Sequence, residues 1–283
     1  MSVNNPASRL LKIIQDGQKQ KKDQQAADAW AAILNVPKDD KSLLLSRVGQ
    51  VMALPGAIKG EIEQLDNINH QLHLKWLPSV EKSFGILNLQ IQWKQFIERF
   101  NAETIFGLEV CDDALGRNRP EKIADPGSLE SLLKDVNALI ADLKEDELSP
   151  DLRDFIFEHL TLVKNAVEEY KIRGIRPLEA EVERLTGAVA RNPQVWIRTR
   201  ETDLGKRFWH VMGNLAIATT IVVGQLQIGH EVFDALSPGD GTPPTVQTDV
   251  EVNINMLTND FDTNEKSSGT LPKPALPNGY GKS

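Results

Sequence analysis

The stretch from Phe208 to His230 constrains the fold of this chain more than any other part of the sequence. It contains no Asp, Glu, Lys or Arg, although 25% of the whole chain is charged. Lys206 and Arg207 precede it and Glu231 follows it. A membrane-spanning helix needs about 20 mostly apolar residues, so the stretch is long enough to cross a bilayer. Its three glycines and its Asn and Gln side chains make it a poor membrane helix. A central core helix and a conditionally inserted membrane segment are therefore both open.

Within this stretch, apolar side chains cover nearly the whole circumference of a predicted helix. Ala216, Thr220 and Gly224 are small residues spaced by four, so they share one face and permit close approach of another helix. A helix that is apolar on nearly all sides is either buried in a helical core or placed in lipid. The residues expected to form this core or membrane helix are Phe208, Trp209, Leu215, Ala216, Ile217, Thr220, Ile221, Val222, Val223, Gly224 and Ile228.

Charge and cysteine content restrict the classes of function. The net charge of −8 and the pI near 5.3 argue against general nucleic-acid binding, which usually requires a basic surface. The single cysteine, Cys111, excludes an internal disulfide framework and fits a reducing compartment. The first 22 residues contain no apolar run long enough for a signal-peptide core. We expect a cytoplasmic protein, with peripheral or conditional membrane association as the open alternative.

Apolar residues repeat at helical spacing along most of the chain. From Ala57 to Leu72 they fall at intervals of three and four, after a break predicted at Pro55-Gly56. Ile86, Leu89, Trp93, Phe96 and Phe100 form a coiled-coil-like seam, so two long antiparallel helices are expected between residues 57 and 100. Another apolar stripe begins after Ser128. Ser149-Pro150-Asp151 predicts a helix start in which Ser149 provides the cap.

These patterns predict an all-α fold, a multi-helix bundle of about eight or nine helices with a disordered C-terminal tail. The expected parts begin with a basic polar lead-in at 1–22, in which a short amphipathic helix with Leu10, Leu11, Ile13 and Ile14 is followed by a polar run at 15–25 that is expected to be a solvated arm. After it come an N-terminal helical subdomain at 23–115, a loop or joint at 116–127, a C-terminal helical subdomain at 128–202, the uncharged hydrophobic helix at 203–237 and the tail at 238–283.

Residue types that could carry chemistry are present without the spacing that chemistry requires. His70 and His73 lie three apart on one predicted helix face, but no third metal ligand accompanies them. His159 is not part of an HExxH motif, and the acids next to Cys111 disfavour a reactive thiolate. The acidic run that includes Glu181 is expected on the solvent side of a helix. The sequence therefore predicts no catalytic, cofactor-binding or metal-binding residues, and no cofactor.

Two classes of function fit these observations. The first is a non-catalytic interaction or scaffold protein that binds a protein partner, or associates with itself, through helix faces and the tail. The second is a membrane-acting effector of the toxin or defence type, which inserts residues 208–230 into a bilayer when triggered. Neither class binds nucleic acid, and neither is an enzyme.

Overall fold

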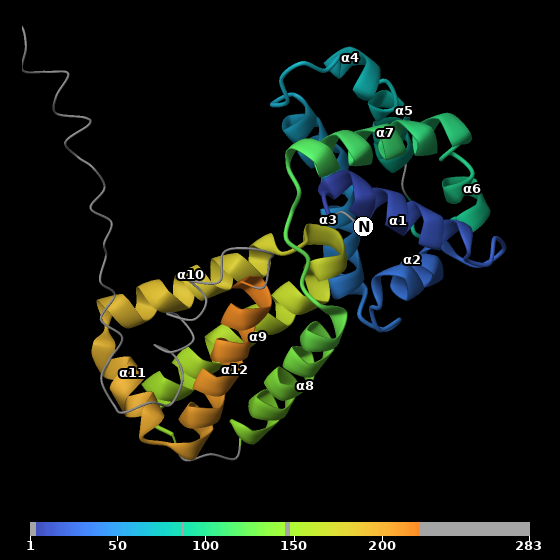
Figure 1. Cartoon of the computed structure of the whole chain (residues 1–283). Helices are drawn as coiled ribbons and strands as arrows, with labels where there is room; N and C mark the ends of the chain where they lie inside the picture. The colour runs from blue at the N-terminus through green and yellow to red at the C-terminus, as the bar shows by residue number, and fades with distance from the viewer. Residues whose placement is uncertain (1–3, 86–87, 145–147, 221–283) are drawn as a thin grey trace, which may run out of the picture. The chain divides into compact units, whose positions relative to one another are not determined.

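The computed structural model describes residues 4–85, 88–144 and 148–220, and within them the chain is all-helical, with no strand. Figure 1 shows twelve helices in this part of the chain, of which α4 is a single turn, so the predicted number of eight or nine was too low. They are α1 Pro6–Gln18, α2 Ala26–Leu34, α3 Lys41–Ile62, α4 His70–His73, α5 Leu77–Gly85, α6 Trp93–Ile97, α7 Ala102–Asn118, α8 Pro126–Asp142, α9 Pro150–Arg173, α10 Arg176–Arg191, α11 Pro193–Arg200 and α12 Asp203–Thr220. The tail predicted at 238–283 lies outside the described residues.

The buried apolar residues form two clusters within one compact unit. The N-terminal cluster comes from α1 to α7 together with Ile172 of α9. The C-terminal cluster runs from Ala124 to Ala216 and is built from α8 to α12. Helix α9 packs against α1 and α3 as well as α8 and α10, so it belongs to both halves of the fold.

The short amphipathic helix predicted near the N-terminus is present as α1, and it extends to Gln18, into the run predicted as a solvated arm. Asn5 caps α1 by accepting bonds from the backbone N–H groups of Ala7 and Ser8, and Pro6 opens the helix. Leu10 and Ile13 are fully buried because α7 and α3 cover α1. Only the polar run after α1 is largely exposed. The apolar stripe of Leu10, Leu11, Ile13 and Ile14, visible in the sequence, is the side of α1 that is buried.

The break predicted at Pro55-Gly56 was wrong, because α3 continues through Pro55 to Ile62. Proline in a helix interior removes one backbone hydrogen bond and usually kinks or ends the helix. Here Val51, Leu54, Ile58 and Ile62 are all buried on one side of α3. Burial of this continuous apolar face outweighs the loss of one hydrogen bond.

The coiled-coil-like seam predicted over residues 86–100 does not form one long helix. Residues 86–87 lie outside the described residues, and α6 covers only Trp93–Ile97. The preceding chain turns at residues 88–91, where Ile91 N–H donates to the carbonyl oxygen of Asn88 at 3.3 Å. Its backbone also pairs with residues 24–27: Ala26 N–H donates to the carbonyl oxygen of Ile91 at 2.8 Å, and Trp93 N–H donates to that of Gln24 at 2.8 Å. The aromatic residues of the predicted seam, Trp93, Phe96 and Phe100, are buried nonetheless, in a cluster of rings.

The start of α9 was predicted correctly, but its capping was not. Pro150 is the first helical residue, and Asp151 lies in the first turn. The Ser149 side chain makes no capping hydrogen bond. Its hydroxyl instead accepts a hydrogen bond from Arg198 at 3.1 Å, which ties the start of α9 to α11.

Candidate interaction groove

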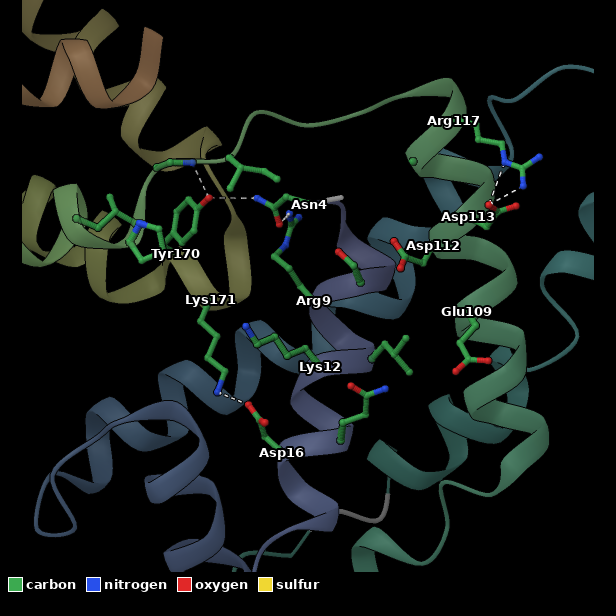
Figure 2. A pocket seen from close by; sticks show the side chains of 18 of the residues that line it. Asn4, Arg9, Lys12, Asp16, Glu109, Asp112, Asp113, Arg117, Tyr170 and Lys171 are labelled. Carbon is green, nitrogen blue, oxygen red and sulfur yellow. Dashed lines mark hydrogen bonds and ion pairs between the residues drawn. The ribbon is translucent and has the colours of Figure 1, made fainter. Parts of the chain in front are cut away.

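An open groove of about 960 Å³ runs along α1. Figure 2 shows α1 passing through the middle of the view, with α7 on one side and the end of α9 on the other. The link between α7 and α8 closes one end. The outer face of α1 forms the floor, with Ser8, Leu11, Lys12, Gln15 and Lys19 among its lining residues.

A buried ion pair fixes the closed end of the groove. Arg9 pairs with Glu121, and each side chain is only 9% exposed. The Arg9 Nε donates to the carbonyl oxygen of Ile172 at 3.0 Å, which joins α1 to α9. Gly174 lies against this guanidinium with φ +68°, where a side chain would be strained and would collide with Arg9. The charges here neutralise each other and hold the groove in shape.

Tyr170 completes the same end as a positioned hydroxyl. Its oxygen accepts a hydrogen bond from the backbone N–H of Ala124 at 2.9 Å and a long one from Asn4 at 3.5 Å. Burial raises the pKa of Tyr170, and these two hydrogen bonds offset only part of the rise. The neutral phenol therefore secures the α7–α8 link against α9.

An ion pair also ties the α9 wall to α1. Lys171 of α9 binds Asp16 at 2.8 Å and the carbonyl oxygen of Ile33 at 2.9 Å. Burial raises the pKa of Asp16, but hydrogen bonds from Lys171 and Lys19 outweigh it, so the net pKa is lowered. Asp16 therefore stays ionised and keeps this wall fixed.

The opposite wall, α7, carries carboxylates. Asn5 donates to Asp112 Oδ1 at 2.7 Å. Burial raises the pKa of Asp112, and the neighbouring charge of Asp113 adds to the rise, while the bond from Asn5 opposes it. Asp113 is bound to Arg117 on the solvent side, with 2.9 Å between Arg117 Nε and the carboxylate oxygen.

Three groups in the groove remain open for a ligand. Lys12 and Glu109 form no ion pair with any described residue, and Figure 2 shows Lys12 reaching toward the α9 side while Glu109 reaches from α7 toward α1. Ile123, in the α7–α8 link, is 45% exposed at the edge of the groove. The groove thus offers an apolar edge, one cation on one side and one anion on the other.

Most charged side chains that line the groove are held by hydrogen bonds or ion pairs. The lining contains no His or Cys, and most of its carboxylates are held by Arg, Lys or Asn. In the described part of the chain, no group of three or more His, Cys, Asp or Glu side chains is placed to hold a metal ion.

The residues predicted as a core or membrane helix are only partly within the described chain. Phe208, Trp209, Leu215 and Ala216 are buried in the C-terminal cluster, and Ile217 is half-buried. Thr220 is the last described residue. Residues Ile221, Val222, Val223, Gly224 and Ile228 lie outside the description. Within residues 4–85, 88–144 and 148–220, no helix has both the length and the apolar character needed to cross a membrane.

The other residues considered from the sequence are held by local contacts. The His70 ring donates to the backbone carbonyl oxygen of Leu65 at 2.8 Å, and the His73 ring donates to that of Asn69 at 2.8 Å. Cys111 is buried, receives a hydrogen bond from Trp76 at 3.3 Å, and its pKa is raised by burial. None of these three side chains lines the groove.

Glu181 was predicted on the solvent side of its helix, and this was wrong. Its side chain is 2% exposed and lies 2.5 Å from His159 Nδ1, with Arg184 on its second oxygen at 3.1 Å. The alternating acidic residues of α10 suggested a solvent-exposed helix face, but α9 packs over position 181. The hydrogen-bonded pair of His159 and Glu181 is therefore part of the C-terminal core.

Sequence reasoning missed the groove because its residues come from four distant segments. Asn5 and Asp112 are bonded although 107 positions separate them, and Arg9 and Ile172 are 163 positions apart. One signal was available, namely that Arg9 shares a helix face with the buried Ile13. A cation on an apolar stripe requires a buried partner.

Comparison with known proteins identifies no relative: no family model, curated protein or solved structure matches this chain.

Proposed function

We propose that this protein is a non-catalytic interaction or scaffold protein, and that the groove along α1 binds an amphipathic helix of a partner protein. The observation that carries the proposal is a preorganised open groove whose walls are fixed by internal ion pairs. Such walls need little reordering when a ligand binds, which lowers the entropic cost of association.

The chemistry of the open groups specifies the partner. A helix laid along α1 would place its apolar stripe against Ile123 and Leu11, following the usual recognition of a helix in a groove. Acidic side chains on one flank would meet Lys12, and basic side chains on the other flank would meet Glu109. Complementary charges on both flanks fix the direction and register of the bound helix.

Site-specific photo-crosslinking in the source cells tests the proposal. A benzophenone amino acid at Ile123 should give one discrete adduct with a partner protein. The same group at Phe157, which is 49% exposed on α9 but does not line the groove, is the matched control. Lys12→Glu should abolish the adduct by charge reversal without lowering the melting temperature. Equal labelling at both positions, or an adduct insensitive to Lys12→Glu, would refute groove binding.

The second candidate is a membrane-acting effector that uses residues 208–230. It is supported by the absence of Asp, Glu, Lys and Arg from that stretch. Flotation of the full chain with anionic vesicles, lost in Ile221→Arg while the circular dichroism spectrum is unchanged, would support it. A full chain that never floats would exclude it.

A further inference from the structure

The solvent-facing side of α3 is unusual because it carries no charge over more than four turns. Between Lys41 and Lys59, every exposed residue is Ser, Ala, Gly, Leu or Met. Leu45 is 59% exposed and Met52 is 39% exposed. Exposed helix faces normally carry charged side chains, and grouped apolar exposure marks an interaction surface.

These residues follow a regular seam along α3. Ser42, Leu45, Gly49, Met52 and Gly56 are spaced by three, four, three and four, which is the spacing of residues that face a partner helix in a coiled coil. A Cβ built on Gly49 or Gly56 would meet nothing within 4 Å, so neither glycine is required by packing inside the protein. Glycine within a helix costs about 0.5–1 kcal/mol relative to alanine, so two of them on one exposed seam need another reason.

We infer that this seam pairs with the same seam of a second copy of the chain, with the two α3 helices antiparallel. If a two-fold axis passes between positions 50 and 51, Leu45 of each copy faces Gly56 of the other, and Met52 faces Gly49. Both large side chains then enter the space left by a glycine, which is the self-complementarity that a two-fold interface requires.

The alternative parallel pairing lacks this fit. It would set Leu45 against Leu45 and Gly49 against Gly49, which leaves crowded layers next to empty ones. The charges at the helix ends also favour the antiparallel pairing. Antiparallel pairing brings Lys41, which forms no ion pair with a described residue, toward Glu63 of the second copy, whereas parallel pairing places Lys41 beside Lys41. Opposed helix dipoles also favour the antiparallel arrangement.

The seam is separate from the groove along α1, since none of its residues lines the groove. Dimerisation therefore does not depend on the proposed partner binding, and each can fail without the other.

Light scattering coupled to size-exclusion chromatography of the full chain tests for the dimer. The wild-type protein should have twice the mass of one chain. Gly56→Leu adds apolar surface but fills the space for Leu45, so it should raise the dissociation constant at least about tenfold. Met52→Glu should raise it more, by about a hundredfold, because a carboxylate would be buried against a glycine. Phe157→Glu, at an exposed apolar position on α9, should remain dimeric. A wild-type chain that is monomeric at every soluble concentration overturns the inference.

Disulfide crosslinking decides the orientation. Leu45→Cys mixed with Gly56→Cys should give a covalent dimer, while Leu45→Cys alone should not. In the antiparallel pair the two Leu45 positions are 11 residues apart along the axis, about 16 Å at 1.5 Å per residue. A disulfide needs Cα atoms within about 7 Å. The native Cys111 is buried, and the wild-type chain is the control for it. Crosslinking of Leu45→Cys with itself would overturn the antiparallel pairing.

Discussion

The N-terminal and C-terminal clusters reach the same degree of burial by different means. The N-terminal cluster uses several short helices around interlocking aromatic rings. The centroid of the Trp93 ring lies 5.3 Å from the ring centroids of both Trp30 and Phe96. The Phe96 ring also contacts the rings of Phe84 and Phe100. The C-terminal cluster uses long amphipathic helices, of which α9 has 24 residues. Large rings allow a short helix to bury enough area to hold its place. The longer helices of the C-terminal cluster repeat apolar residues along one face, and they too bury rings, among them Trp196, Phe208 and Trp209.

The two clusters also differ in where the partners of their buried ionisable side chains lie. In the C-terminal cluster the His159–Glu181 pair is enclosed within one half of the fold. The buried cations of the N-terminal half, Arg9 and Arg47, instead reach across to partners on or near α9. Buried charges in the N-terminal half therefore join the two clusters, and the buried pair in the C-terminal half fixes two neighbouring helices of the same cluster.

The largest expected effect is the loss of the aromatic centre of the N-terminal cluster. Trp93→Ala should lower the free energy of unfolding by about 4 kcal/mol, because it leaves a large cavity and removes the indole hydrogen bond to Gly17. Denaturant unfolding measures the change. Phe157→Ala, an exposed aromatic on α9, should change stability by less than about 0.5 kcal/mol. Similar losses in both variants would contradict the role given to the ring cluster.

The buried pair of the C-terminal cluster gives the next largest effect. Glu181→Ala should cost about 3 kcal/mol, because His159 is left buried without its partner. Replacing both residues with Leu should recover most of that loss, since an apolar pair of similar size needs no charge compensation. Denaturant unfolding of the single and double variants measures this coupling. A double variant as unstable as Glu181→Ala would show that the pair is needed for more than its own neutralisation.

Removing a link between the clusters should have a smaller effect. Arg47 of α3 pairs with Glu169 of α9, which is also held by Gln50 at 2.8 Å and Arg173 at 2.7 Å. Arg47→Ala should cost about 2 kcal/mol, because these other partners still compensate Glu169. Chemical unfolding followed by tryptophan fluorescence should measure the loss. An Arg47→Ala variant of wild-type stability would show that this pair does not join the clusters energetically.

The same link predicts a dependence on pH. Burial raises the pKa of Glu169, but the hydrogen bonds from Arg173 and Gln50 and the charge of Arg47 outweigh it, so the folded pKa lies below the usual 4.5. A depressed folded pKa stabilises the protein above the unfolded pKa, and this stabilisation is lost as the pH falls through the folded pKa. Wild-type stability should therefore fall below pH 4.5 more steeply than that of Glu169→Gln, as thermal melts can show.

A substitution on the outer face of α3 should act in the opposite direction. Gly49→Ala adds a Cβ that meets nothing within 4 Å. In the monomer it should raise the free energy of unfolding by about 0.5–1 kcal/mol, because alanine loses less entropy than glycine in a helix. Measurement at concentrations below dimerisation separates this gain from the loss of pairing. A destabilised monomer would mean that the glycine serves packing within the chain.

The smallest effect concerns an exposed pair in the C-terminal half. Hydrogen bonds from Arg198 and Ser149 lower the pKa of Asp151 from 3.8 to about 2. In Arg198→Ala this pKa should return toward 3.8, which an NMR titration of the Asp151 carboxyl group can follow. The contribution of this ion pair to stability is present above pH 3.8 and is lost as the pH falls toward 2. Global stability at neutral pH should hardly change, because exposed ion pairs contribute little.

The sequence by itself determined the all-helical class and many helix positions. Apolar spacing of three and four located α8 and α9, and Pro150 marked the first residue of α9 correctly. These features depend on neighbours along the chain, such as fixed proline geometry and one continuous apolar face. Local information is therefore sufficient to predict them.

Only the tertiary structure decided where single charges and short segments lie. In the folded chain Glu181 is buried against α9, Arg9 pairs with Glu121, and the turn that precedes α6 is hydrogen-bonded to residues 24–27 in place of a helical seam. Each of these outcomes depends on a partner far away in the sequence, and the energy of that contact overrides the local preference. The groove along α1 is of this kind. Its walls come from separate helices, so the folded chain alone brings them together.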